Sequence, residues 1–249
     1  MTINEELTNL KLYKESGIDE FYNDSPYVFF ESNSFAFPVA KAPTPQQPTE
    51  KNISILKASE EAKKTLQNIS TIDALQQSIL DFKLNPLSKF ATHPITGIGV
   101  KNPSLLVITE SPNSDEDRTG IPLSGPTGEL LKKILLAINS SVETNTFTFP
   151  ASPLRAPGNR TPTEEEMEIS KPFTLKFIEI LKPKIILTMG SIPADILLNT
   201  KEPITTLRGK WFKYENIDVM PTFSLNYLLN NIEAKKKTWE DLKLLREKL

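Results

Sequence analysis

Cysteine is absent from this chain of 249 residues. The absence excludes disulfides, thiolate metal sites and cysteine nucleophiles. Histidine is nearly absent as well, because the single residue, His93, stands beside Pro94 in a turn-like stretch. One histidine cannot build a histidine-based metal site, so we expect no metal centre and interpret His93 as a loop residue rather than a catalyst.

A long apolar run and an excess of basic charge are also missing. No run reaches the roughly 20 apolar residues that a membrane-spanning helix needs, and no charged-then-apolar leader opens the chain. We therefore expect a cytoplasmic protein that does not engage membranes. The chain carries 29 basic and 31 acidic residues, a net charge of −2. Because a protein that grips many phosphates normally has a basic face, any binding of nucleic acid is expected to be local, weak and salt-dependent.

A proline-rich spacer marks the clearest boundary in the chain. Its composition cannot bury enough apolar surface to fold, and its prolines are Pro38, Pro43, Pro45 and Pro48. We predict a helical and aromatic segment over residues 1–37, a linker over 38–54 and one folded domain over 55–249. We favour packing of the aromatic segment on the chain's own domain over its being a site for a protein partner, and we expect a monomer.

Short apolar runs alternate with helical patterns over the rest of the chain. The predicted strands are Leu105–Ile108, Thr146–Phe149, Ile185–Met189 and Ile217–Met220. The predicted helices include one capped by Thr71, Gly128–Asn139, one that opens with a capping box at Thr163 and Glu166, one from near Ser191, and one from about Asn231 to Leu249. Pro172 lies inside the helix that opens at Thr163 and runs toward Leu181, so we predict either two helices there or one kinked helix. The alternation predicts a three-layer α/β/α fold with a four-stranded parallel sheet.

The stretch Leu105–Leu131 holds the most informative pattern. A buried strand leads into a long loop rich in glycine, proline and acidic residues, and the loop leads into a helix. In an α/β sheet such a loop lies at the carboxyl end of its strand, where ligands bind. An ordinary crossover is the alternative, but loops of this length in compact domains are usually functional, so we favour a site.

The residues of this loop resemble a known signature. The order Glu-x-Pro, Glu-Asp-Arg, Gly-x-Pro and Gly-x-x-Gly-x-Leu-Leu resembles the first motif of the uracil-DNA glycosylase superfamily, in the bacterial branch called family 4. Arg155–Pro162 and Leu207–Leu229 resemble two later motifs, in the same order. The resemblance implies an α/β/α fold and a protein of base excision repair that acts on DNA.

The resemblance also identifies the positions of the pocket. Glu110 matches the carboxylate that the family associates with water positioning, and Pro112 matches the proline of the same motif. Thr109 and Asn113 stand where the family has glycine, so a Cβ at each position narrows the loop.

Three further pocket positions depart from the family. Leu123 replaces the aromatic residue that stacks on the base, Pro150 replaces the asparagine that reads it, and Ser224 replaces the histidine that donates to the leaving base. Proline can read no base edge. Ser224 can still donate a hydrogen bond, so Glu110 and Ser224 remain the candidate catalytic residues.

The iron–sulfur cluster of many family members is expected to be absent. Its four cysteine positions correspond to Phe82, Asn85, Leu154 and Ser170, none of which supplies a thiolate. We therefore expect no cofactor.

Two functions remain open. The first is a glycosylase-like protein with lost or strongly reduced uracil excision, which keeps a scaffold for DNA or a protein partner. The second is an active DNA glycosylase with an altered base preference that uses Glu110. Weak, salt-dependent contact with DNA is expected through Gly125, Gly128, Arg155, Arg160, Arg208 and Lys210; Asn230 stands where an arginine is common in the family.

Overall fold

The structure is a computed structural model, and residues 50–249 are the part of the chain that it describes. The aromatic segment predicted over residues 1–37 lies outside this part, as does most of the predicted linker. Helix α2 begins at Glu50, within the range 38–54 that the proline pattern predicts as linker. No helix in the described range is both long and apolar enough to cross a membrane.

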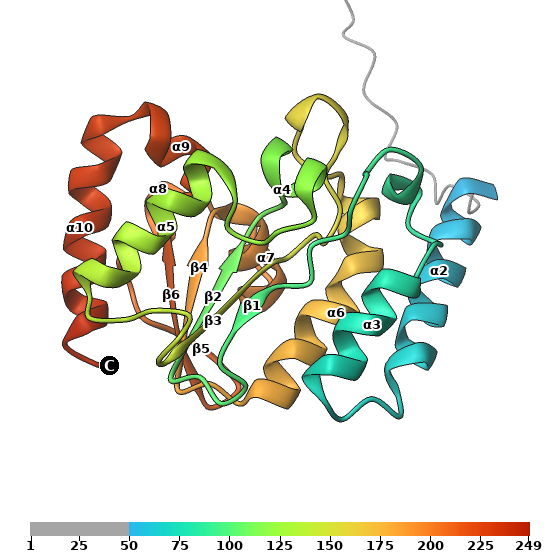
Figure 1. Ribbon diagram of the computed structural model, residues 1–249, viewed down its shortest axis with the longest axis horizontal. Coiled ribbons are helices and arrows are strands. Elements are labelled where there is room, and N and C mark those ends of the chain that lie inside the picture. The colour runs from blue at the N-terminus through green and yellow to red at the C-terminus, as the bar shows by residue number, and fades with distance from the viewer. Residues whose placement is uncertain (1–49) are drawn as a thin grey trace, which may run out of the picture. The chain divides into compact units, whose positions relative to one another are not determined.

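A mixed sheet forms the centre of the fold, with strand order β1-β3-β2-β4-β6-β5 (Figure 1). Its central strands pair in parallel and coincide with the predicted apolar runs: β2 (Leu105–Thr109), β3 (Thr146–Pro150), β4 (Ile185–Met189) and β6 (Ile217–Thr222). Their carboxyl ends therefore meet at one edge of the sheet, as the predicted site requires.

The predicted number of strands is wrong, although the fold class is confirmed. Two short strands pair antiparallel at the edges, β1 (Ile98–Gly99) beside β3 and β5 (Phe212–Tyr214) beside β6. Strands of two and three residues are too short to show an alternating apolar pattern. Such short edge strands also limit the unpaired edge that a sheet exposes.

Helices cover both faces of the sheet. The longer ones are α2 (Glu50–Leu66), α3 (Ile72–Asp81), α5 (Gly125–Ala137), α6 (Glu164–Leu181), α7 (Ser191–Leu198) and α10 (Ile232–Arg246). The shorter ones are η1 (Pro86–Lys89), α4 (Ser114–Thr119), η2 (Pro157–Asn159), α8 (Ile204–Leu207) and α9 (Leu225–Asn230).

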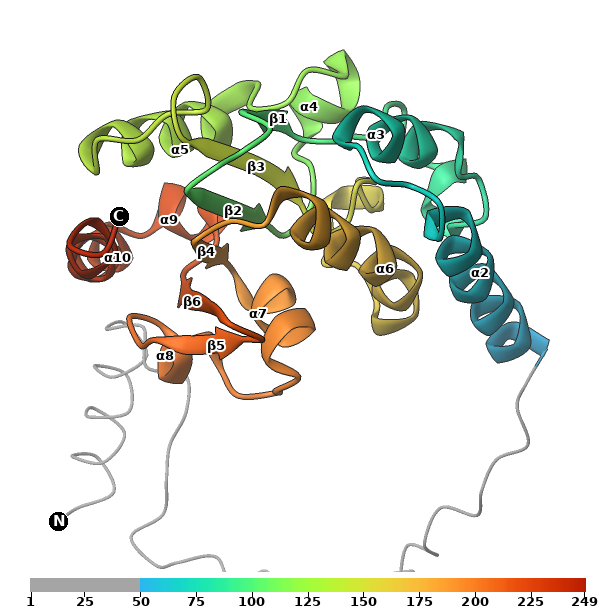
Figure 2. The same cartoon turned by 90° about the horizontal axis from the view of Figure 1, so that it is seen from below.

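The two faces of the sheet bury two separate cores. Leu106 and Ile108 of β2 point into a core with α2, α3, α6 and α7, whereas Leu105 and Val107 point into a core with α5, α9 and α10. Successive residues of a strand face opposite sides, so the continuous apolar runs of the central strands supply both cores. Figure 2 shows the two sets of helices on opposite sides of the sheet.

Local helix signals are confirmed at several points. The side chain of Thr71 caps α3, and Thr163 with Glu166 forms the predicted capping box of α6. Pro172 lies inside α6, which continues as one helix through it. Helix α4 was not predicted, because its six residues lie in a stretch that was interpreted as loop.

Candidate functional site

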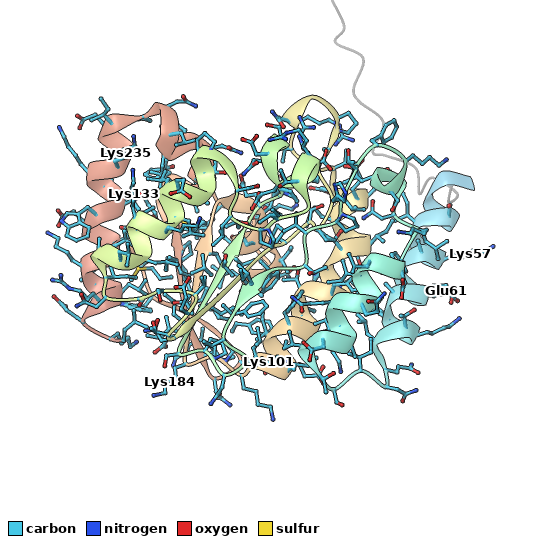
Figure 3. All side chains as sticks on the ribbon, viewed as in Figure 1. Lys57, Glu61, Lys101, Lys133, Lys184 and Lys235 are labelled. Atoms are coloured by element: carbon cyan, nitrogen blue, oxygen red, sulfur yellow. The ribbon has the colours of Figure 1, made fainter. Side chains whose placement is uncertain are left out.

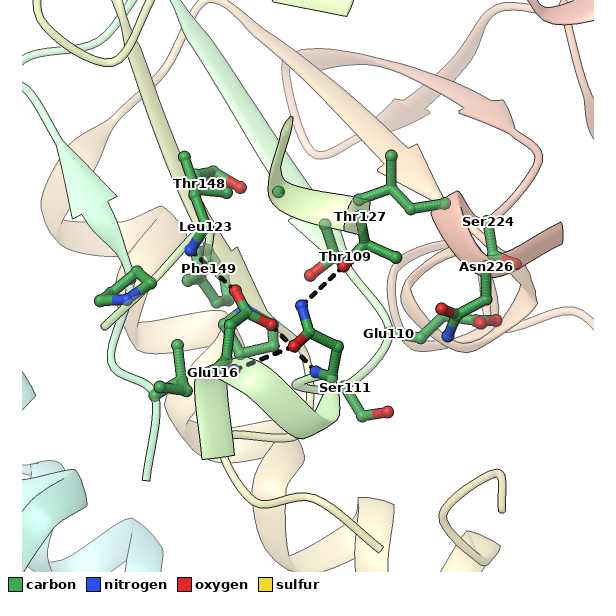
Figure 4. Close-up of a pocket in the computed structure, with 17 residues that line it drawn as sticks. Thr109, Glu110, Ser111, Glu116, Leu123, Thr127, Thr148, Phe149, Ser224 and Asn226 are labelled. Carbon is green, nitrogen blue, oxygen red and sulfur yellow. Dashed lines mark hydrogen bonds between the residues drawn. The ribbon is translucent and has the colours of Figure 1, made fainter. Parts of the chain in front are cut away.

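A pocket opens where the carboxyl ends of β2 and β3 meet the start of α9. Its lining includes seven of the predicted site residues, namely Thr109, Glu110, Asn113, Leu123, Gly128, Pro150 and Ser224 (Figure 4). Pro112 is buried in the same loop but is not among the lining residues. The fold thus gathers residues from three separate motifs into one place.

The pocket is small. Its cavity has a volume of 40 Å³. Sites that bind small molecules usually measure about 300–1,000 Å³. The cavity is therefore smaller than the sites that usually hold small molecules.

Asn113 closes one side of the pocket by capping α4. Its Oδ1 accepts from the backbone N–H groups of Asp115 (2.7 Å) and Glu116 (2.9 Å). Its Nδ2 donates to the carbonyl oxygen of Ser124 (2.9 Å) and the hydroxyl of Thr127 (2.6 Å). The predicted role of Asn113 as mere bulk is therefore incomplete, because its side chain ties α4 to the start of α5.

Glu116 lines the pocket and was missed by the sequence analysis. Its carboxylate accepts from the backbone N–H groups of Asn113 (2.9 Å) and Leu123 (2.8 Å). Burial raises the pKa of this carboxyl above its ordinary value, and those two hydrogen bonds oppose the rise. The capping-box pattern Asn113-x-x-Glu116 is the sequence signal that could have identified it.

Leu123 sits in a strained position at the base-stacking site. Its φ is 62°, in the left-handed region that costs a non-glycine residue about 1–2 kcal/mol. Its side chain is buried in the core beside α5 and also lines the pocket. Gly128 permits this arrangement, since a Cβ there would lie 2.0 Å from the carbonyl oxygen of Leu123. Gly125 has the same steric role, because its Cβ would lie 2.4 Å from the Asp115 carboxylate.

Glu110 ends β2 and reaches the first turn of α7. Its Oε1 accepts from the backbone N–H of Ser191 at 3.1 Å, and the Ser191 hydroxyl lies at 3.5 Å. Gly190 allows the approach, since a Cβ there would lie 2.3 Å from the carboxylate carbon. Burial raises the pKa of the Glu110 carboxyl, and hydrogen bonds from Ile192, Ser191 and Ser224 oppose the rise.

The Glu110→Gln variant is expected to be more stable than the unmodified protein at neutral pH. Because the pKa of Glu110 is raised in the folded state, its stabilising contribution is present at low pH and is lost as the pH rises through that value. The amide never carries the buried charge, so the gain in melting temperature should grow from pH 4.5, the ordinary glutamate pKa, to neutral pH.

Thermal melts of both proteins across this range measure the effect. Glu129→Gln is a control of opposite sign, because a hydrogen bond from Lys132 lowers the pKa of Glu129. A gain for Glu110→Gln that shrinks with rising pH would contradict the assignment.

Two polar side chains from the start of α9 complete the pocket. Ser224 is the N-cap of α9 and accepts from the backbone N–H of Tyr227 at 3.4 Å. Asn226 lines the pocket two residues later and was not predicted. Figure 4 shows Glu110, Ser224 and Asn226 together on one side of the pocket, away from Leu123 and Glu116.

The basic residues predicted to contact DNA are mostly engaged with acids of the same chain. Arg160 pairs with both carboxylate oxygens of Glu166, at 2.6 and 2.8 Å. Arg155 lies 3.6 Å from Asp117, and Arg208 lies 2.5 Å from Asp241. Lys210 is exposed. The labelled lysines Lys57, Lys101, Lys133, Lys184 and Lys235 lie at separate places on the body in Figure 3.

Two of the four positions that match the family's cluster cysteines, Asn85 and Ser170, are in contact, and the side chains at all four do not fit an iron–sulfur cluster. Asn85 donates to the Ser170 hydroxyl at 3.2 Å and accepts from the backbone N–H of Leu87 at 2.9 Å. Leu154 packs with Leu87, and Phe82 packs edge-on to Phe173 at 5.2 Å. The set contains no thiolate, and the Asn85 amide is already hydrogen-bonded within the protein. Among the described residues, no group of three or more His, Asp or Glu is placed to hold a metal ion.

The Asn85→Ala variant is expected to lower the free energy of unfolding by about 1–3 kcal/mol, since it leaves the buried Leu87 N–H without its acceptor and removes the hydrogen bond to the Ser170 hydroxyl. Asn85 is 4% exposed, so water cannot replace it without rearrangement. Chemical denaturation measures the loss. The exposed Asn102→Ala is the matched control and should change stability by less than about 0.5 kcal/mol. Equal effects of the two variants would contradict the structural role of Asn85.

Comparison with known proteins agrees with this geometry. Residues 96–243 match the family model described as the uracil DNA glycosylase superfamily. The type-4 uracil-DNA glycosylase of Sulfurisphaera tokodaii is 28% identical over 187 residues, which are 72% of this chain and 85% of that protein. The type-4 enzyme of Thermotoga maritima is 32% identical over 163 residues, 63% of this chain and 83% of that protein.

A further relative is of another kind. A DNA polymerase of Bacillus phage SP01 is 26% identical over 162 residues, which cover 65% of this chain but 17% of the polymerase. The family model spans more than half of the chain, and the described pocket lies within the matched range apart from Ile95. The chain belongs to the uracil DNA glycosylase superfamily.

Proposed function

We propose that this chain is a uracil-DNA glycosylase-like DNA repair protein in which uracil excision is lost or strongly reduced. The observation that carries the proposal is the pocket, with a cavity of 40 Å³ and with Leu123 and Pro150 at the positions where the family stacks and reads the base. The protein keeps the scaffold of the family as a platform for DNA or a partner, because the fold and the surrounding loops persist.

The chemistry of excision supports this proposal. An enzyme must read the polar edge of a flipped base and stabilise the anion that forms on the leaving group. Loss of a group that reads a hydrogen-bonding edge removes discrimination of about 10⁴–10⁵, and loss of one donor to the anion costs about 10²–10³ in rate. Pro150 has no side-chain donor or acceptor, and Ser224 is short and neutral. The effects of these substitutions on the rate are not additive, because they fall in one pocket. Together they are expected to abolish excision of uracil at an ordinary rate.

Contact with DNA is weak in this proposal. Arg155, Arg160 and Arg208 each form an ion pair with a carboxylate of the same chain, which lowers the net positive charge near a bound phosphate. Affinity for DNA is expected to fall with salt and to vary little with sequence. The proposal also includes a cytoplasmic monomer. It includes no iron–sulfur cluster, because none of the four residues at the cluster positions supplies a thiolate and two of them, Asn85 and Ser170, are hydrogen-bonded to each other.

An altered base preference is the second candidate function. Glu110, Ser224 and Asn226 give the pocket one polar side, which a base other than uracil could meet after the loop opens. In this alternative, Glu110 attends the water and Ser224 donates to the leaving base.

The deciding experiment offers single-stranded and duplex oligonucleotides that carry uracil, hypoxanthine or xanthine. Abasic sites are detected by alkaline cleavage, and the Thermotoga maritima enzyme is the positive control for uracil. The proposal expects no cleavage of any of these. Excision of hypoxanthine or xanthine that Glu110→Gln abolishes would establish the second function, and efficient release of uracil would reject the first.

A further inference from the structure

We propose that a second cavity, between α6 and α7, binds a small aliphatic amine, with its ammonium group held by the Asp195 carboxylate and its alkyl chain laid on an apolar floor. This cavity shares no lining residue with the pocket at the ends of β2 and β3. The inference therefore goes beyond the proposed function and does not depend on whether uracil is excised.

The size of the second cavity is the first argument. Its volume is 430 Å³, against 40 Å³ for the pocket at the ends of β2 and β3. Sites that bind small molecules usually measure about 300–1,000 Å³. The two helices that form it, α6 and α7, cover the same face of the sheet (Figure 2). A small organic molecule therefore fits between them.

The position of Asp195 is the second argument, because this acid lies in the last turn of α7, whose range is Ser191–Leu198. The carbonyl groups at the end of a helix carry partial negative charge, so cations are favoured there and anions are not. The last turn of α7 has no basic residue. The Asp195 carboxylate is therefore placed where a cation from solution would stabilise it.

The hydrogen bonding of Asp195 points the same way. Its Oδ1 is buried and has no hydrogen-bond partner among residues 50–249. Burial raises the pKa of the Asp195 carboxyl above its ordinary value, the positive charge of Lys201 opposes the rise, and the negative charge of Glu164 adds to it. The protein itself thus compensates this carboxylate only in part, and a bound ammonium group would complete the compensation.

The rim of the cavity can open to a cation. Lys201 donates to Glu164 at 2.6 Å, with side chains that are 75% and 85% exposed. An ion pair this exposed contributes little to stability, so its separation costs little. Three carboxylates, of Glu164, Glu168 and Asp195, line the cavity against two lysines, Lys171 and Lys201. The lining therefore favours a cation over an anion.

The apolar floor of the cavity selects the kind of cation. Pro162, Met167, Ile192 and Ile196 line it together with the acids. A metal ion would gain nothing from these side chains, and among the described residues no group of three or more His, Asp or Glu is placed to hold one. An alkylammonium ion removes its chain from water on the floor while its charged end meets a carboxylate. This combination identifies an aliphatic amine as the ligand.

Isothermal titration calorimetry of the full chain with 1,4-diaminobutane tests the proposal. Saturable binding at one site is expected. The matched diol, 1,4-butanediol, lacks the charge and should bind at least about 10-fold more weakly, because a hydrogen bond to a charged group is lost. Methylamine keeps the charge but lacks the chain, and it should also bind at least about 10-fold more weakly, because less apolar surface is buried.

Variants assign the binding to this cavity. Asp195→Asn keeps the shape of the side chain, removes a partly buried charge and is expected to reduce the affinity for the diamine at least about 10-fold. Lys201→Gln removes the competing ammonium group and is expected to raise the affinity about 3-fold. The exposed Glu247→Gln, which lies outside the cavity, is the control and should leave the affinity unchanged. Circular dichroism shows whether each variant keeps the fold.

Several outcomes would overturn the inference. The first is the absence of saturable binding, which would mean that water alone fills the cavity. The second is a diol or methylamine that binds as tightly as the diamine, since charge or chain would then take no part. The third is an equal loss of affinity in Asp195→Asn and Glu247→Gln, which would indicate unspecific attraction to surface acids. The fourth is weaker binding by Lys201→Gln, because Lys201 would then hold the ligand rather than compete with it.

Discussion

Uracil excision is expected to stay undetectable in the Ser224→His variant and to return only when Leu123→Phe, Pro150→Asn and Ser224→His are combined. Each substitution restores a different requirement: a stacking face, a base-reading amide, or a donor to the leaving base. A histidine alone would face a pocket that still excludes the base. The combined effect should therefore exceed the sum of the single ones, as is usual for groups that act as a unit.

Position 123 is the hardest of the three positions to restore. Leu123 has a positive φ of 62° and is buried in the core beside α5, so a phenylalanine there must turn out of the core to reach a base. Stability must therefore be measured for every variant. Asn113→Gly, which would restore a family glycine, is expected to impair the site, because it removes the cap of α4 and the bonds to Ser124 and Thr127.

Single-turnover assays on a uracil-containing single strand measure the series. A site built to read a hydrogen-bonding edge discriminates by about 10⁴–10⁵, so we expect recovery of the reading group to be visible well above the background. Pro150→Ser is a matched control for the loss of the proline itself, since it restores a backbone N–H donor but supplies no side-chain carboxamide. This account of the pocket would be refuted if the unmodified protein, or the Ser224→His variant alone, excised uracil at a rate near that of the Thermotoga maritima enzyme.

The Asp241→Ala variant is expected to lower the free energy of unfolding by about 3–5 kcal/mol, the cost of leaving one partner of a buried ion pair behind. Asp241 lies on α10 with 2% exposure. Its carboxylate accepts from Arg208 at 2.5 Å and from the Thr222 hydroxyl at 2.7 Å. The three residues join α10, the end of β6 and the segment after α8, so their loss affects the whole carboxyl-terminal face of the sheet.

Arg208 has further contacts, so removal of its side chain is expected to lower the stability of the protein. Its guanidinium also donates to the carbonyl oxygen of Lys237 and lies 5.3 Å from the centre of the Phe223 ring. Gly209 allows the carboxylate to approach, since a Cβ there would lie 2.3 Å from Asp241 Oδ1. Arg208 was predicted as a DNA contact, and its structural partners make stability the larger effect of its removal.

Urea denaturation of Asp241→Ala, Asp241→Asn and Glu240→Ala measures the effect. The asparagine variant keeps an acceptor for Thr222 and should cost less than the alanine variant. Glu240 is the neighbouring carboxylate, paired with Lys243 on the surface at 2.5 Å, and its removal should change stability by less than about 1 kcal/mol. Similar losses for Asp241→Ala and Glu240→Ala would contradict the buried pair.

Much of the fold was predictable from the sequence because its signals are local. The central strands appear as continuous apolar runs, which reflect burial on both faces, and the caps at Thr71 and Thr163 lie within three residues of the groups they bind. The edge strands β1 and β5 and the short helix α4 escaped prediction, because segments of two to six residues show too little periodicity.

The candidate site was predictable only in part. The motif order assigned Glu110, Leu123, Pro150 and Ser224 to one pocket, and the fold brings them together. Glu116 and Asn226 were missed because their roles depend on where α4 and α9 begin. The resemblance could assign positions by matching motifs, but it could not give the volume that remains between their side chains.

The sequence by itself determined the family, the fold class and the departures from the family's pocket motifs, because each is written in the order of residues along the chain. Only the tertiary structure decided what the charged side chains do. Glu110 meets Ser191 across 81 residues, and Arg208 meets Asp241 across 33. The identity of a charged residue in the sequence does not reveal whether its side chain faces DNA, water or a buried partner. The free energy of that charge is set by the burial and the partners that folding provides.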